Sequence, residues 1–110
     1  MTYNLELAER MRRILLSNPQ VSEKKMFGGT AFMIHGNLAC GVHGDGMIVR
    51  VGETAHAETM QKPGVHPFDM TGKPMKGWVV VEAARLQSEA DLAGWIDAGM
   101  SFASSLPPKK

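Results

Sequence analysis

The chain contains almost no cysteine, since Cys40 is the only one among its 110 residues. A single thiol excludes an intrachain disulfide and is typical of a protein that works in a reducing compartment. Long apolar runs are also missing. No stretch approaches the roughly 18–20 residues that span a bilayer, and no apolar N-terminal segment precedes a cleavage site. We therefore expect a cytoplasmic protein with no membrane partner.

The sequence also lacks an excess of charge of either sign. The formal net charge is +1, which neither favours nor excludes a nucleic-acid partner. Apolar residues make up 44% of the chain and charged residues 21%, as in globular domains rather than disordered ones. A chain of this length forms one ordinary core. We expect a single domain over residues 1–110, with a polar tail at 106–110.

Recognisable catalytic patterns are lacking as well. The sequence has no phosphate-binding Walker loop, no nucleophile elbow and no paired acidic motif. Cys40 and His43 lie an odd number of residues apart on a predicted strand, so their side chains point to opposite faces and cannot form a nucleophile–base pair. The histidines match no compact zinc-binding spacing; they are His35, His43, His56 and His66. We predict no catalytic residue, no metal ligand and no cofactor, and we do not expect an enzyme.

What the sequence does contain is a central segment, 30–51, that predicts three antiparallel strands. The dipeptides Gly36-Asn37 and Gly44-Asp45 each separate two apolar runs. Glycine supplies the positive φ that tight hairpin turns need, so both dipeptides predict two-residue turns. A turn at Gly36-Asn37 would pair Met33 with Cys40 across the first hairpin.

The second predicted turn pairs Cys40 with Val49, and the two registers together assign each side chain to a face of the sheet. Phe32, Ile34 and Ile48 then form an apolar strip on the face opposite to Cys40. Such a strip is either covered by the rest of the chain or offered to a partner. The sequence leaves both alternatives open.

An amphipathic helix is predicted before the meander, at 4–17. Its apolar residues recur at helical spacing, and they are Leu7, Met11, Ile14 and Leu15. Asn4 is the expected N-cap, and Asn18-Pro19 ends the helix. The segment 22–29 then leads into the sheet, with Gly28-Gly29 as a bend or bulge.

A second long helix is predicted at 88–106, with Ser88 as its N-cap and Gly99 allowing close approach to the sheet. Between the meander and this helix we expect a short helix at 53–61, an irregular connection at 65–77 and a strand at 78–82. The predicted fold class is α+β. It has two layers, an antiparallel sheet with a central three-stranded meander covered by N- and C-terminal helices.

The motifs of the chain resemble those of the TfoX N-terminal domain family, named for the bacterial competence regulator TfoX, also called Sxy. The resemblance rests on KKMFGGTAFMIHGNLACGV, IVRVG, HPFDMTGKPMKGWVVVE and DLAGWIDAGMSFASSLPPK. Its most specific residues are Met26, Phe27, Gly28, Gly29, Lys73, Pro74, Lys76, Gly77 and Trp78. The resemblance implies a two-layer α+β domain similar to secretion-chaperone-like folds. It supplies no agreed catalytic residues.

The same resemblance implies a role in regulation. Named members of the family regulate competence genes together with the cyclic-AMP receptor protein, and they carry a second, helical domain at the C-terminus. We expect the present chain to correspond to the N-terminal domain on its own. The leading hypothesis is a small protein-interaction module that contacts proteins of the transcription machinery through Phe32, Ile34 and Ile48. Self-association to a homodimer through this strip or through a sheet edge is a natural consequence.

Two further hypotheses stay open. Direct nucleic-acid binding would use basic residues, if they converge on one surface; the candidates are Arg10, Arg12, Arg13, Lys24 and Lys25, joined by Lys73 and Lys76. A small-ligand or enzymatic pocket would form between Gly28-Gly29 and the segment Lys73–Trp78, if the two family motifs meet in the fold.

Overall fold

The computed structural model describes residues 4–26, 29–68 and 76–107. Within these ranges the order of elements is α1 (Leu5–Leu15), β1 (Val21–Met26), β2 (Gly29–Ile34), β3 (Asn37–His43), β4 (Gly46–Arg50), α2 (Glu53–Met60), β5 (Val65–Pro67), β6 (Trp78–Val81), the 3₁₀ turn η1 (Ala83–Arg85) and α3 (Glu89–Ser104). The described strands form one antiparallel sheet in the order β1-β2-β3-β4-β6-β5.

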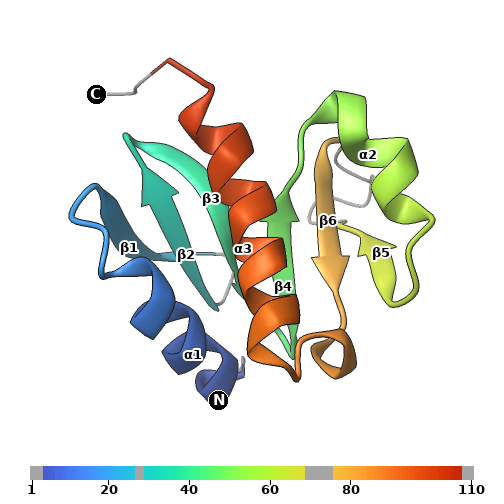
Figure 1. Ribbon diagram of the computed structural model, residues 1–110, viewed down its shortest axis with the longest axis horizontal. Coiled ribbons are helices and arrows are strands. Elements are labelled where there is room, and N and C mark those ends of the chain that lie inside the picture. The colour runs from blue at the N-terminus through green and yellow to red at the C-terminus, as the bar shows by residue number, and fades with distance from the viewer. Residues whose placement is uncertain (1–3, 27–28, 69–75, 108–110) are drawn as a thin grey trace.

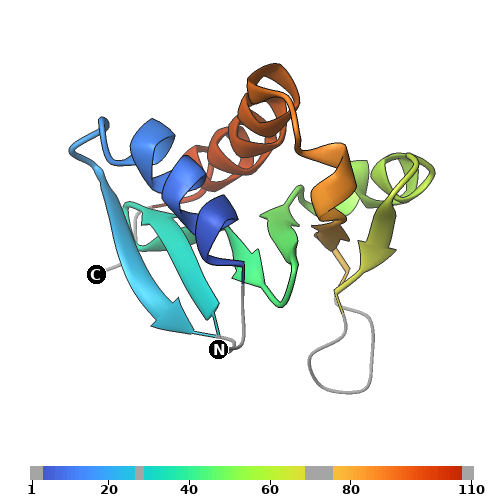
Figure 2. The same ribbon diagram turned by 90° about the horizontal axis from the view of Figure 1, so that it is seen from below.

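The helices form the second layer of the molecule. Figures 1 and 2 show α1 and α3 lying across one face of the sheet, and α2 beside β5 and β6 at its far end. The core lies between α1, α3 and this face, where the valines of β4 and β6 meet the apolar stripes of the two long helices. The predicted α+β fold, with a central meander covered by the N- and C-terminal helices, is confirmed.

The first hairpin differs from its predicted register by one residue. The two residues with positive φ are His35, at 53°, and Gly36, at 81°. These are the central residues of the turn, because a turn that matches the twist of a hairpin needs positive φ at both positions. Ile34 therefore pairs with Asn37, and Phe32 pairs with Cys40 across a bulge. The predicted turn at Gly36-Asn37 is wrong.

This shift decides what happens to the predicted apolar strip, because a slip of one residue moves side chains to the other face. Phe32 and Ile34 lie in the core beneath the helices, with 0% and 4% of their surface exposed. In the second hairpin the predicted pair Cys40–Val49 is confirmed, and Ile48 pairs with Gly41 on the opposite face, where it is 0% exposed. None of the three side chains is available at the surface, and Ile48 lies on the face opposite to Phe32 and Ile34, so the predicted strip does not form.

Both long helices begin as their sequences predict. The Asn4 side chain accepts a hydrogen bond from the Leu7 backbone N–H at 3.0 Å, which caps α1. Ser88 caps α3 by accepting from the Asp91 backbone N–H, also at 3.0 Å. Further along α3, a Cβ on Gly99 would lie 2.4 Å from the carbonyl oxygen of Ala39. The predicted close approach of this helix to the sheet is confirmed.

Two edge strands are absent from the sequence prediction. The polar sequence of β1, VSEKKM, has low β-propensity, yet it pairs with β2 along all six residues. The short strand β5 lies within the segment predicted as irregular, and it ends at Pro67 on the outer edge, where a proline removes no ladder bond. Pairing with a neighbouring strand, rather than local propensity, forms both strands.

Candidate functional site

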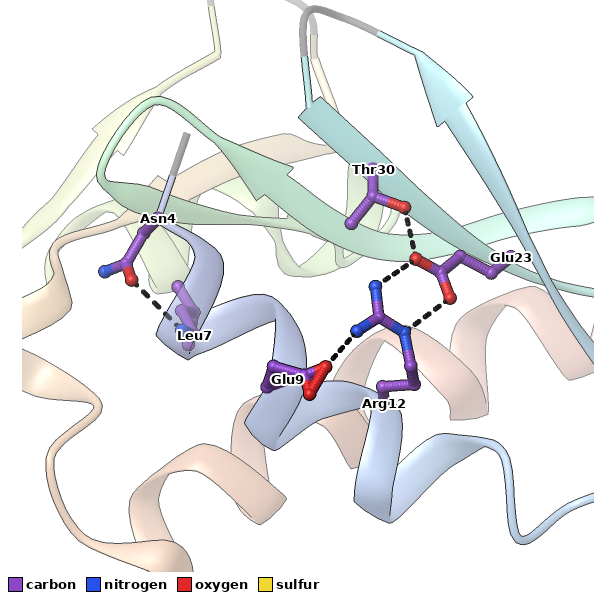
Figure 3. A network of polar contacts seen from close by, with 6 residues as sticks. All are labelled: Asn4, Leu7, Glu9, Arg12, Glu23 and Thr30. Carbon is purple, nitrogen blue, oxygen red and sulfur yellow. Dashed lines mark hydrogen bonds and ion pairs between the residues drawn. The ribbon is translucent and has the colours of Figure 1, made fainter. Parts of the chain in front are cut away.

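The basic side chain of Arg12 is engaged in a polar network between α1 and the sheet (Figure 3). Its Nε donates to Glu23 Oε1 at 2.8 Å and its Nη2 donates to Glu23 Oε2 at 2.6 Å, while Nη1 donates to Glu9. The Thr30 hydroxyl donates to Glu23 Oε2 at 2.8 Å. The Arg12–Glu23–Thr30 network therefore joins α1, β1 and β2.

Each charge in this network stabilises the other. The hydrogen bonds from Arg12 hold the pKa of the Glu23 carboxyl below its usual range, and the Thr30 hydroxyl acts in the same direction. The hydrogen bond to Glu23 raises the pKa of the Arg12 guanidinium in turn. Arg12 is a structural cation whose Nε, Nη1 and Nη2 each donate to a carboxylate within the chain.

The other candidate nucleic-acid residues that the structure describes are not brought together into one open basic patch, and Lys73 lies outside the described residues. Arg10 forms an ion pair with Glu89 at 3.2 Å and also donates to the Gln87 carbonyl. Lys24 and Lys25 are exposed neighbours on β1, so they point to opposite faces of the sheet. Arg13 is exposed on α1. The hypothesis of a converging basic surface stays a prediction that this geometry does not favour.

The described part of the second family motif joins the start of β6 to the start of α2. The Gly77 N–H donates to His56 Nδ1 at 3.0 Å. Its carbonyl accepts from the N–H groups of Val51 at 2.8 Å and Gly52 at 3.1 Å. Gly52 and Gly77 have φ values of 88° and 93°, which L side chains rarely adopt. Glycine at both positions lets the two backbones meet.

The two family motifs, in their described parts, lie on different strands. Gly29 belongs to β2, and a Cβ there would lie 2.0 Å from the Val42 carbonyl oxygen, so the glycine serves close strand packing. Gly77 and Trp78 lie at β6, with β3 and β4 in between. Phe27, Gly28, Lys73 and Pro74 are outside the described residues, as is the Met26 side chain. Whether the complete motifs share one pocket stays a prediction.

A small pocket lies beside this junction, centred on Arg50 at the end of β4. The Arg50 Cζ atom is 5.0 Å from the ring centroid of Trp78 and 5.4 Å from that of Phe102. The pocket has a volume of about 150 Å³, and its lining residues are Arg50, Gly52, Glu53, Lys76, Gly77, Trp78 and Phe102. We call it the Arg50 pocket. It collects the described residues of the second family motif that were predicted as site candidates, Lys76, Gly77 and Trp78.

A larger groove of about 650 Å³ runs between α2 and α3. One wall is the exposed row Ala90, Gly94 and Ala98 on α3, and beside it lies the half-buried ring of Trp95. Lys62, just after α2, places its Nζ 5.4 Å from the Trp95 ring centroid. The remaining lining residues are Val51, Ala55, Thr59, Pro63, Arg85 and Asp91. We call this the α2–α3 groove.

Comparison with known families identifies the kind of domain. The family model described as the TfoX N-terminal domain matches residues 13–103, most of the chain. The chain belongs to the TfoX N-terminal domain family. No curated protein and no solved structure matches it. The matched span contains the lining residues of both the Arg50 pocket and the α2–α3 groove.

Among the described side chains with catalytic potential, His66 and Glu82 contact each other at the surface beside β5, whereas Cys40 lies in the core of this TfoX N-terminal domain. Cys40 is fully buried, and burial raises the pKa of its thiol to about 12, so at neutral pH it is a protonated core residue. Across the described ranges, no three His, Cys, Asp or Glu side chains gather in a way that could hold a metal ion. Nor does any described helix have the length and apolar character needed to cross a membrane.

Sequence reasoning missed the residues that shape both hollows of this TfoX N-terminal domain. Arg50, Phe102 and Lys62 were not singled out, because each meets its ring partner across 28 to 52 residues of sequence, where no local pattern exists. One weak signal was present. Arg50 is the only charged residue in the otherwise apolar run 47–51, and a cation there needs a partner that the strand itself does not supply.

Proposed function

We propose that this chain is a regulatory protein-interaction module that binds an acidic segment of a partner protein in the α2–α3 groove. The main support for this proposal is the groove itself, which combines a row of exposed small residues with a half-buried tryptophan. This surface replaces the strip of Phe32, Ile34 and Ile48, whose side chains are all buried. Membership of a family named for a competence regulator supports a regulatory role and makes the transcription machinery the first class of partner to test.

Gly94 supports the groove as a place of close approach. A glycine inside a helix costs roughly 1 kcal/mol relative to alanine. At Gly94 a Cβ would meet no atom within 4 Å, so the packing of the chain does not require the glycine. With Ala90 and Ala98 it forms a row spaced by four residues, which lies along one side of the helix. The row leaves space for a partner backbone beside Trp95.

The charges around the groove favour an acidic partner. Among its lining residues, Lys62 and Arg85 are cations and Asp91 is the one carboxylate. Lys62 lies over the Trp95 ring, and this contact already restricts the lysine side chain. Binding a partner there therefore costs little additional side-chain entropy. A segment with an apolar residue for Trp95 and carboxylates for Lys62 and Arg85 would match this surface.

The first step of the test identifies the partner by crosslinking. A photo-crosslinking amino acid at Ala98 should capture the partner in cells of the native source, and the same group at exposed Arg13 should not.

The second step measures binding of the purified partner to two variants at Gly94, which separates binding from stability. Gly94→Leu should raise the melting temperature, because leucine is a better helix former, and should weaken binding by roughly tenfold or more by filling the groove. Gly94→Ala should raise stability with much less effect on binding.

A second pair of variants checks the charge. Lys62→Glu with Arg85→Glu should abolish binding, whereas Lys24→Glu with Lys25→Glu on the distant strand β1 should not. Equal crosslinking from Ala98 and Arg13, or a partner whose affinity is unchanged by Gly94→Leu, would remove the groove as the binding surface. Loss of the partner on nuclease treatment would instead transfer the proposal to nucleic acid.

A further inference from the structure

We propose that the Arg50 pocket binds an oxyanion, a carboxylate or phosphate group of a ligand, through the guanidinium of Arg50 and the ammonium of Lys76. The pocket shares no lining residue with the α2–α3 groove, so this proposal goes beyond the function proposed above and stands or falls separately.

The first argument is that Arg50 is held in place while its hydrogen-bond donors stay open. Contacts with the rings of Trp78 and Phe102, at 5.0 and 5.4 Å, fix the position of the cation. A guanidinium carries five N–H donors in a planar fork that matches carboxylate and phosphate. In the part of the chain that the structure describes, no oxygen accepts a hydrogen bond from the Arg50 guanidinium and no carboxylate forms an ion pair with it.

The second argument compares Arg50 with the other arginines. Arg10 and Arg12, which fasten α1 to its neighbours, each meet a carboxylate of the chain. Arg13 and Arg85 are exposed, so water can satisfy their donors. Arg50 is half-buried and still has no such acceptor among the described residues. Leaving a partly desolvated cation without an acceptor is costly, so an external anion is the expected partner.

The third argument is the shape and charge of the pocket. A volume of about 150 Å³ accommodates one small anionic group rather than a large ligand. Two cations, Arg50 and Lys76, line it against one carboxylate, Glu53. Gly52 and Gly77 contribute only backbone, and a Cβ on Gly77 would lie 3.3 Å from the Glu53 nitrogen, which would narrow this wall. The opposing carboxylate makes a second prediction, since its neutralisation should strengthen anion binding.

Trp78 is a built-in reporter for the test. The chain has two tryptophans, so Trp95→Phe leaves Trp78 as the only one. In this background, inorganic phosphate and acetate are titrated separately at constant ionic strength with chloride as the balancing anion. We expect a saturable change in Trp78 fluorescence in the millimolar range, together with shifts of the Gly52 and Gly77 amide signals in ¹⁵N spectra. The amide of Gly29, on β2, serves as the internal control.

Three variants connect the signal to the pocket. Arg50→Met should weaken binding by about tenfold or more, since charge-assisted bidentate hydrogen bonds are strong. Arg50→Lys, which keeps the charge and loses the fork, should weaken it less, and Glu53→Gln should tighten it roughly two- to fivefold. Thermal unfolding of each variant confirms that it is folded. If Arg50→Met does not fold, Arg50→Lys and Glu53→Gln still decide the matter.

The outcomes separate the sources of the anion. Saturation by phosphate alone assigns the pocket to a phosphate group, and saturation by acetate alone assigns it to a carboxylate. Responses that only follow ionic strength, that are unchanged by Arg50→Lys, or that are not strengthened by Glu53→Gln would overturn the proposal. Loss of partner binding in the α2–α3 groove has no bearing on these titrations, so the two proposals fail independently.

Discussion

At the scale of single residues, burial decides the chemistry of this chain more than residue type does. Cys40 is a nucleophile by type, but it lies fully enclosed in the core and its thiol has a raised pKa. Arg50 is a surface residue by type, but two aromatic rings hold it in a half-buried position. Neither environment follows from the neighbours of these residues in the sequence.

We expect the Cys40 thiol to be unreactive in the native protein. An aromatic disulfide reagent at pH 8 should label it only at the rate of unfolding, and one thiol per chain should react at once in guanidinium chloride. Burial raises the pKa of the thiol from 9.0 to about 12. The protonated thiol therefore makes its full contribution to the free energy of unfolding below pH 9. This contribution is lost as the pH rises toward 12. Chemical unfolding of Cys40→Ala should show a smaller decline over this range, and rapid native labelling would contradict the assignment.

At the scale of elements, two specific contacts add to the apolar packing of the long helices on the sheet. The Arg12–Glu23–Thr30 network fastens α1 to β1 and β2, and backbone contact at Gly99 seats α3 against β3. The first contact is electrostatic and depends on pH. The second is steric and does not.

The α1 contact should weaken in acid. The pKa of Glu23 is lowered in the folded chain, so its stabilisation is present above the ordinary value of 4.5 and is lost as the pH falls through the lowered folded value. At pH 7, Glu23→Gln should destabilise the protein by about 1 kcal/mol, a figure reduced for partial exposure of both partners. The difference from wild type should shrink below pH 4, as followed by urea unfolding. A double-mutant cycle with Arg12→Met that shows no coupling would refute the pairing.

Two glycines of α3 make a matched pair for the steric contact. Gly99→Ala places a Cβ 2.4 Å from the Ala39 carbonyl oxygen, so we expect a loss of about 1–3 kcal/mol despite the better helix propensity of alanine. Gly94→Ala meets no atom within 4 Å and should gain roughly 0.5–1 kcal/mol. Urea unfolding of both variants measures the difference. Equal effects at the two positions would show that α3 does not contact β3 at Ala39 as described.

At the scale of the whole molecule, the sheet is buried on both faces at its centre. The helices cover the face of Phe32 and Val49, while Phe68 packs among side chains of the other face, with its ring 5.7 Å from that of His43 and 6.2 Å from that of Trp78. Ile48, which pairs with Gly41, is fully enclosed on this other face. The α2–α3 groove and the Arg50 pocket lie away from this buried centre.

Ile48→Arg should therefore prevent folding instead of weakening an interface. A buried unpaired charge costs several kcal/mol, which is comparable to the whole stability of a small domain. Leu16→Arg is the control, because Leu16 is 43% exposed and the change should alter stability only slightly. Circular dichroism and thermal unfolding distinguish the two variants. A folded, soluble Ile48→Arg protein would mean that the face carrying Ile48 is open, contrary to the burial of this side chain.

The sequence by itself determined the elements whose signals are local. The helical spacing of Leu7, Met11 and Leu15, the caps at Asn4 and Ser88, and the β-branched run of β6 all predict what the structure contains. The motifs around Gly29 and Gly77 identified the family from residues alone. These features are visible because the interactions behind them act within a few residues of the chain.

Only the tertiary structure decided the rest. The register of the first hairpin depends on whether His35 or Asn37 takes the positive φ beside Gly36, and the bulge at Ala39 under Gly99 can be seen only when β3 and α3 are packed together. That register placed Phe32 and Ile34 in the core. The Arg50 pocket and the α2–α3 groove are built from residues far apart in the sequence. Contacts between residues far apart in the sequence form such sites, and the hydrophobic periodicity of the sequence does not reveal these contacts.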